Sequence, residues 1–267
     1  VVSGPGAARA ALLDDRARLV VMPYAVLGGS LLLAAALIRL SPLPPLAAER
    51  DQGEGSVWKH PQLVLGVAAL FVYVWAEVLA GDSIPVYAER CGVPLDVAKS
   101  LTSLTLTAML VGYGLGIALI PRRLSQSGAL ALSALTALAC ACGILMSDPA
   151  ATMPFVLPDP GALALRPVEL PVTVVFVALL GLGNALMWPA IWPLAVDGIG
   201  PALRKGSALL IMAILGGALA MPVWTWQAGD GAAAGSQAAY AMLIPFYLYI
   251  GWYARWGSAW RRWGGAG

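Results

Sequence analysis

Two side chains stand out chemically in residues 71–83, which read FVYVWAEVLAGDS. Tyr73 and Glu77 are four positions apart, so a helix places both on one face and Trp75 on another. A carboxyl group in such apolar surroundings can exchange a proton or hydrogen-bond a polar solute. The structural alternative is a permanently protonated Glu77 that bonds a neighbouring helix. The residues alone leave both interpretations open.

A second group of side chains lies in residues 181–200, which read GLGNALMWPAIWPLAVDGIG. Asn184, Trp188 and Trp192 recur every four positions and form one helical stripe. An amide beside flat indole rings suits a sugar, whose hydroxyl groups hydrogen-bond at the edges while its C–H face packs on a ring. The prolines that follow the two tryptophans permit a bend, because proline cannot donate a backbone hydrogen bond. Alternatively, Asn184 joins two helices and the tryptophans face lipid.

The chain has the composition of a membrane protein. Hydrophobic residues make up 60% of it and charged residues 11%, with a mean hydropathy of +0.79. Soluble domains contain about a quarter charged residues. A charge at the bilayer centre costs about 2.5 to 3.5 kcal/mol, so we expect Glu77 to face the bundle interior or a water-filled cavity. The net charge of +2 gives no reason to expect a nucleic-acid partner.

No cofactor or metal site is expected. His60 is the only histidine, and no cluster of Cys or carboxylate side chains lies at ligand spacing from it. Cys91, Cys140 and Cys142 are too few for a framework of disulfide bridges. The last two lie within an apolar run, where cysteine behaves as a small hydrophobic residue.

Seven apolar runs are long enough to cross a bilayer, whose hydrocarbon core needs about 20 helical residues. They are residues 20–40, 61–81, 99–120, 128–147, 170–196, 207–227 and 237–255. Stretches rich in Pro, Gly and charge separate them, and two of these, 41–56 and 147–167, are predicted to be long loops. The predicted fold class is therefore all-α, a polytopic membrane bundle of seven transmembrane helices.

The third and sixth runs carry glycines whose predicted role is helix packing. Gly112 and Gly116 in the third run follow the small-xxx-small pattern of closely packed helices. Gly216 and Gly217 in the sixth run indicate a helix that bends or one that packs closely. Neither pattern requires a ligand.

The loops between the runs fall into two groups that differ in positive charge. One group carries ten basic residues: Arg39, Arg50, Lys59, Arg122, Arg123, Arg204, Lys205, Arg255, Arg261 and Arg262. The other group carries three: Arg90, Lys99 and Arg166. Cytoplasmic loops are enriched in Lys and Arg, so the first group and the C-terminus are predicted to be cytoplasmic.

Seven spans then place the N-terminus outside. The chain begins with Val1 rather than Met, and the polar segment before the first run has no convincing signal-peptide cleavage site. We therefore expect a fragment, with further spans upstream and residues 1–18 forming an external loop.

The residues discriminate among classes of membrane protein. A retinal protein needs a lysine inside a late span, and no run holds one away from its ends. An intramembrane aspartyl protease needs paired aspartates at depth, whereas Asp82 lies at the end of a run without such a partner. A carrier or channel fits best, because its helices are broken by Gly and Pro and its polar and aromatic side chains face an internal pathway.

Four stretches resemble the fucose, galactose and glucose proton-symporter family of the major facilitator superfamily. They are residues 71–88, 181–200, 206–223 and 237–253, in the family's order and spacing. Residues 22–44 are similar to the family's sixth helix and central cytoplasmic loop. The Ala-Glu-Val at 76–78 and the Gly-x-x-Asn that ends at Asn184 look closer to glucose and galactose porters than to L-fucose permeases.

The resemblance implies that the seven spans are helices 6 to 12 of a twelve-helix transporter. It assigns residues 1–18 to an external loop remnant and 19–40 to the last helix of the missing N-terminal half. Residues 41–60 become the central cytoplasmic loop, 61–255 the C-terminal six-helix half and 256–267 a cytoplasmic tail. In this family the sugar site lies between the two halves near the midplane.

The resemblance also implies a function and a set of site residues. The expected activity is secondary active transport of a hexose, glucose/galactose or fucose, across the bacterial inner membrane by proton symport and alternating access. Tyr73, Glu77, Asn184 and Trp188 are the expected substrate-binding residues, and Glu77 is also the candidate for proton coupling. The expected partners are a hexose, a proton, the lipid bilayer and the missing N-terminal half. The alternative is a membrane-embedded sugar receptor or enzyme without transport.

Overall fold

The computed structural model describes residues 5–40, 55–120, 123–159, 164–229 and 231–263. The chain divides into two compact units, Val1–Gln52 and Gly53–Gly267, and each is described by itself. Most of the expected central loop, residues 41–54, lies outside the described residues.

The first unit is a single helix, α1 (Pro5–Leu40). It contains the helix predicted over residues 19–40, but it begins at Pro5, so residues 5–18 are helical and the prediction of a loop there was wrong. Ala, Leu and Arg dominate this segment and favour a helix, and proline is well suited to its first position. The apolar part with described side chains, Val21–Leu37, is shorter than the stretch of about 20 residues that spans a bilayer.

The second unit is a helical bundle, as the sequence predicts. Its helices are α2 (Pro61–Arg90), α3 (Leu95–Ala98), α4 (Leu101–Leu119), α5 (Gln126–Met146), α6 (Val172–Asn184), α7 (Met187–Val196), α8 (Leu203–Met212), α9 (Leu215–Ala228), α10 (Ala233–Ala238) and α11 (Leu243–Arg255). Short 3-10 turns lie at Val57–Lys59, Gly200–Ala202, Ala239–Met242 and Gly257–Ala259. Among the described residues, five helical stretches are long and apolar enough to cross a membrane: Pro61–Arg90, Leu95–Leu119, Gln126–Met146, Val172–Val196 and Gly200–Ala228.

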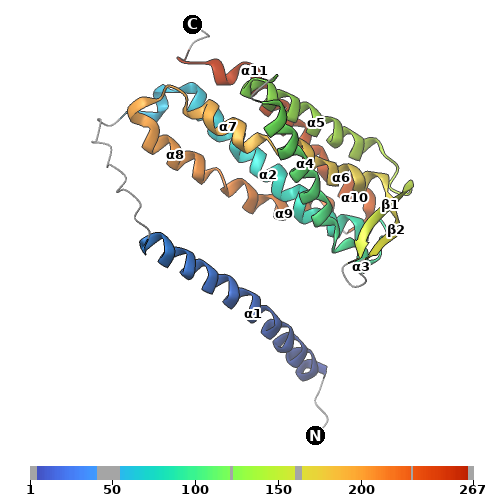
Figure 1. Ribbon diagram of the computed structural model, residues 1–267. Helices are drawn as coiled ribbons and strands as arrows, with labels where there is room; N and C mark the ends of the chain where they lie inside the picture. The colour runs from blue at the N-terminus through green and yellow to red at the C-terminus, as the bar shows by residue number, and fades with distance from the viewer. Residues whose placement is uncertain (1–4, 41–54, 121–122, 160–163, 230, 264–267) are drawn as a thin grey trace. The chain divides into compact units, whose positions relative to one another are not determined.

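The segment 147–167 is not the plain loop that its prolines and glycines suggest. It forms most of a β-hairpin, in which β1 (Thr152–Asp159) pairs antiparallel with β2 (Ala164–Pro171) in a register that matches Thr152 with Pro171. Such a strand tolerates proline because one of its edges stays unpaired. The fold is therefore a helical bundle with a two-stranded hairpin at one end (Figure 1).

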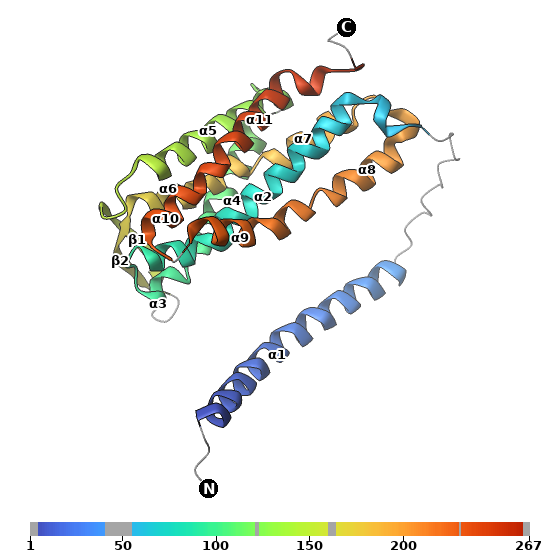
Figure 2. The same cartoon turned by 180° about the vertical axis from the view of Figure 1, so that it is seen from behind.

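Helix α2 lies at the centre of the bundle and packs against α4, α6, α7, α9 and α11. Helix α6 packs against both α4 and α5, and α5 also packs against α11, as the two opposite views show (Figure 2). These contacts place α2, α6, α7 and α11, which carry the candidate site residues and their partners, next to one another.

Two membrane-spanning stretches are interrupted near their middle. Helix α6 ends at Asn184 and α7 begins at Met187, so the helix is interrupted directly before the two Trp-Pro pairs. Helix α8 ends at Met212 and α9 begins at Leu215, just before Gly216. A Cβ atom at Gly216 would meet the carbonyl oxygen of Phe71 in α2, so the helix both bends and packs closely here.

The described loops of the second unit lie at the two ends of the bundle (Figure 1). At the end with more basic residues, Arg261 pairs with Asp197 at 2.5 Å, and the Trp263 indole donates to the Trp58 carbonyl group at 2.6 Å. At the other end, Arg90 donates to Ser236 at 2.7 Å. The hairpin lies at this second end together with α3 and α10 (Figure 1).

Candidate functional site

Tyr73 and Glu77 lie on one face of α2, as their spacing predicts. Tyr73 is 1% exposed, its hydroxyl group interacts with the Glu77 carboxyl group, and Glu77 is half-buried. Tyr113 from α4 and Tyr247 from α11 also interact electrostatically with Glu77. Three tyrosine hydroxyl groups from three helices therefore interact with one carboxyl group, and that of Tyr73 is hydrogen-bonded to it.

Asn184, the last residue of α6, is completely buried. The Tyr247 hydroxyl group donates to its Oδ1 at 3.1 Å, while its Nδ2 has no hydrogen-bond partner among the described residues. Tyr247 also interacts electrostatically with Glu77. The buried position of Asn184 fits the helix-joining alternative, whereas its unpaired amide donor is what a polar ligand would need.

Trp188 lies beside Tyr73, with ring centroids 6.4 Å apart and ring planes inclined at 60°. Trp192 stacks on Trp188 at 6.0 Å and 23°, as expected for residues four apart on one helical stripe. Both indoles are half-buried within this part of the chain, so each keeps an accessible face. The break between α6 and α7 brings Trp188 to α2.

Trp75 lies on another face of α2, as its spacing from Tyr73 and Glu77 predicts. Its ring contacts Phe71 at 6.1 Å and Phe246 of α11 at 5.5 Å, both nearly edge to face. It belongs to the packing between helices and not to the Tyr73–Glu77 cluster.

The sequence analysis missed two members of the cluster. Tyr113 and Tyr247 each place a hydroxyl group inside an apolar run, but so do other tyrosines, such as Tyr240 and Tyr253. Only the packing of α4 and α11 against α2 separates the residues near Glu77 from the rest.

The glycines of the third run have the packing role that their spacing predicts. A Cβ atom at Gly112 would lie 2.6 Å from the Ala185 Cβ, and one at Gly116 would meet Leu186. Helix α4 thus sits directly against the break between α6 and α7, which keeps Tyr113 near the cluster.

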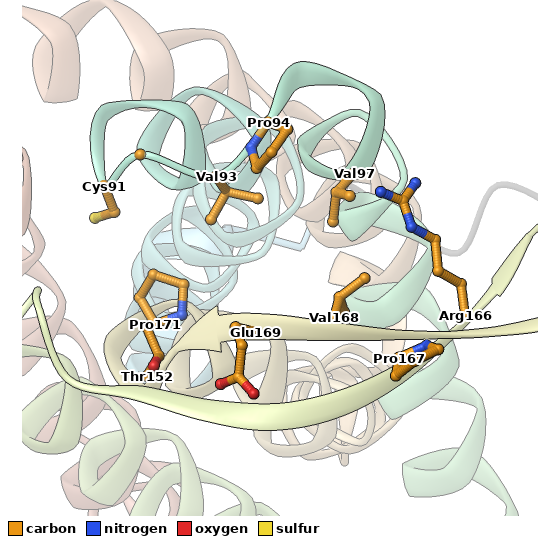
Figure 3. Close-up of a pocket in the computed structure, with 11 residues that line it drawn as sticks. Cys91, Val93, Pro94, Val97, Thr152, Arg166, Pro167, Val168, Glu169 and Pro171 are labelled. Carbon is orange, nitrogen blue, oxygen red and sulfur yellow. The ribbon is translucent and has the colours of Figure 1, made fainter.

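A separate cavity of about 400 Å³ lies under the β-hairpin. Its lining comes from the turn after α2, including Cys91 and Val93, and from the hairpin, including Arg166 and Glu169 (Figure 3). Burial raises the pKa of the Cys91 thiol. The cavity contains none of the four predicted site residues. The described part of the chain has no group of three or more His, Cys, Asp or Glu side chains arranged to hold a metal ion.

Comparisons with known proteins agree with this architecture. No family model matches the chain. A glucose/galactose transporter of Brucella abortus (strain 9-941) is 31% identical over 260 residues, which are 94% of this chain and 57% of the transporter. A second strain of that organism, strain 2308, has a glucose/galactose transporter that matches equally.

Two solved structures share the fold. The crystal structure of the E. coli fucose:proton symporter FucP (N162A) aligns with a TM-score of 0.68 at 22% identity, over 88% of this chain and 54% of that one. FucP in the outward conformation aligns with a TM-score of 0.66 at 21% identity, over the same shares of the two chains. The chain therefore spans somewhat more than half the length of the proteins it matches.

The matched relatives are transporters and not enzymes, and the chain corresponds to their C-terminal portion. Sequence similarity covers 94% of this chain, and the fold similarity covers 88% of it. The chain is a multi-pass membrane protein that is similar in sequence to glucose/galactose transporters over 94% of its length and similar in fold to the fucose:proton symporter FucP.

Proposed function

We propose that the chain is the C-terminal part of a hexose:proton symporter of the bacterial inner membrane that works by alternating access. Its seven predicted spans correspond to helices 6 to 12 of twelve. Residues 1–40 hold the end of the N-terminal half, 41–60 the central cytoplasmic loop, 61–255 the C-terminal half and 256–267 a cytoplasmic tail. The basic end of the bundle and the C-terminus are cytoplasmic.

The observation that carries the proposal is the cluster around Glu77. Its carboxyl group is hydrogen-bonded to Tyr73 and interacts electrostatically with Tyr113 and Tyr247, and it lies in a helix that is long and apolar enough to cross a membrane. Acidic groups at such depth are costly and are retained mainly along substrate or proton pathways. A cluster of hydroxyl groups beside an indole can hold a sugar by hydrogen bonds at its edges and ring contact on its face.

The exposure of these side chains fits a site that a second half completes. Tyr113 is 37% exposed, and Glu77 and Trp188 are half-buried, so one side of the cluster is open in this part of the chain. In our proposal, the N-terminal half covers that side and the hexose binds between the two halves, against Tyr73, Glu77 and Trp188. Asn184 lies behind this surface and offers its free Nδ2 donor when the break between α6 and α7 opens.

Glu77 is the proposed proton-coupling residue. Its side chain is half-buried in this part of the chain, so in our proposal it can exchange a proton with a water-filled space between the two halves. The glucose and galactose named for the Brucella transporters are the preferred hexoses, with fucose as the next candidate.

The test is counterflow in proteoliposomes that contain the complete transporter. Vesicles preloaded with unlabelled glucose, galactose or fucose should accumulate the labelled form of the recognised sugar, and an imposed proton gradient should drive its net uptake. Trp188→Ala should weaken sugar binding, whereas Trp226→Ala, at an 81% exposed indole, serves as the control. Absence of counterflow with all three hexoses would contradict the proposal.

A further inference from the structure

We infer that Thr102 and Gln126 are positioning residues of the proposed transport site, because each holds a backbone carbonyl group that a proline leaves without its helical partner. The inference rests on the proposed function. Neither residue belongs to the cluster around Glu77. Each of them donates a hydrogen bond to a helix that carries a site residue, at the point where a proline interrupts the backbone bonding of that helix.

The first of these contacts joins α4 to α2. Pro85 lies inside α2 and has no N–H group, so the Gly81 carbonyl group cannot accept the usual helical hydrogen bond. The Thr102 hydroxyl group donates to this carbonyl oxygen at 2.9 Å from the neighbouring helix. A carbonyl group without a partner is costly in a membrane, where no water replaces the lost bond.

The second contact joins α5 to α7 in the same way. Pro193 lies inside α7, so the Pro189 carbonyl group loses its helical donor. The Gln126 amide Nε2, at the first residue of α5, donates to that oxygen at 2.9 Å. On two different helices, a carbonyl group that a proline leaves free is thus bonded by a side chain of a neighbouring helix.

Both carbonyl groups lie close to a proposed site residue. Gly81 is one helical turn from Glu77, and Pro189 directly follows Trp188. Thr102 also belongs to α4, the helix of Tyr113, and lies about three helical turns before that residue, so its hydrogen bond holds α4 against α2. Loss of the bond should therefore change the surroundings of Glu77 without removing any group that contacts the sugar.

The Thr102 bond differs from what threonine usually does inside a helix. Thr107 in the same helix donates to the Ser103 carbonyl group at 2.7 Å, and Thr136 in α5 donates to the Leu132 carbonyl group at 3.0 Å. Such bonds to the preceding turn are common for threonine. Thr102 instead reaches another helix, at the residue whose carbonyl group Pro85 leaves free.

The first experiment compares Thr102→Val, Thr102→Ser and Thr107→Val in the complete transporter, reconstituted in proteoliposomes. We expect Thr102→Val to slow hexose counterflow about fivefold, the factor that corresponds to about 1 kcal/mol for one hydrogen bond, and to shift its pH dependence. Thr102→Ser keeps the hydroxyl group, and Thr107→Val removes only a hydroxyl group that bonds within its own helix. Both variants should therefore match the parent in counterflow rate and in pH dependence. An unchanged rate and pH profile for Thr102→Val would overturn the inference.

The second experiment restores the missing N–H group. Pro85→Ala lets residue 85 donate to Gly81, so Thr102→Val should lower the melting temperature of the purified transporter less in that background than in the parent. Likewise, Gln126→Met should lower the melting temperature less in a Pro193→Ala background than in the parent. Strictly additive shifts in both cycles would overturn the inference.

The two proposals fail in different ways. If the parent protein shows no hexose counterflow, the proposed function is wrong, and the melting-temperature cycles still test whether the two side chains hold the carbonyl groups. If the parent transports hexose but Thr102→Val behaves like Thr107→Val, the positioning role is wrong and the proposed function stands.

Discussion

The Tyr247 hydroxyl group donates a 3.1 Å hydrogen bond to Oδ1 of Asn184, and both side chains are buried almost completely. The bond joins α11 to the end of α6, directly before the break that brings Trp188 to α2. It therefore connects the two groups of residues that the sequence shows as separate motifs.

Tyr247→Phe removes the donor and leaves the Asn184 oxygen buried without a partner. We expect it to destabilise the transporter by about 1–3 kcal/mol, measured by thermal unfolding in detergent. Asn184→Ala should also raise the apparent hexose KM. The double variant should lose less stability than the sum of the losses in the two single variants, since the two side chains share one hydrogen bond. Additive losses would show that the bond contributes nothing.

Glu77→Gln keeps the shape of the side chain and removes its exchangeable proton. We expect counterflow, which needs no proton gradient, to persist with a weaker apparent affinity, while uphill hexose uptake driven by a proton gradient is lost. Parallel measurements of the two processes on the same proteoliposomes check this. The assignment of Glu77 is wrong if the variant, at normal abundance in the membrane, accumulates hexose like the parent.

Gly181→Ala tests the close approach of α6 to α4. The added Cβ atom would meet the backbone carbonyl oxygen of Thr105, which cannot move aside without shifting the helix. Overpacking of this kind costs about 1–3 kcal/mol, so the melting temperature should fall.

Gly114→Ala is the matched control for Gly181→Ala. A Cβ atom at Gly114 has no other atom within 4 Å, and alanine favours a helix over glycine by about 1 kcal/mol, so stability should hold or rise. Equal losses for the two variants would argue against the packing of α4 on α6.

Cys91 tests the orientation of the bundle. With Cys140 and Cys142 replaced by alanine, a membrane-impermeant maleimide should label Cys91 from outside the cell, whereas Arg262→Cys, at the opposite end, should react only after the membrane is opened. Burial raises the pKa of Cys91, so less of the reactive thiolate is present at neutral pH than for an ordinary thiol. Labelling should accelerate as pH rises toward that higher pKa. The reverse accessibility would invert the proposed orientation.

Local pattern was sufficient to predict the helical bundle, five stretches of which are long and apolar enough to cross a membrane among the described residues, and the pairing of side chains within each helix. The bilayer sets the length of an apolar run, and the helical repeat alone places Tyr73 with Glu77 and Trp188 with Trp192. Pattern was insufficient in two places. Charged residues suggested a loop at residues 5–18, but their high helix propensity makes them helical. Pro and Gly suggested a loop at residues 147–167, but pairing between β1 and β2 makes most of this segment a hairpin.

The sequence by itself determined that the chain lies in a membrane, that its fold is all-α, and that two sets of side chains each share one helix face. These properties depend only on composition and on spacing within a few helical turns. Only the tertiary structure decided that Tyr113 and Tyr247 interact with Glu77, that Asn184 is buried against Tyr247, and that Thr102 and Gln126 hold the carbonyl groups freed by proline. These contacts join residues far apart along the chain. Their existence depends on how α2, α4, α5, α6, α7 and α11 pack, which no local pattern specifies.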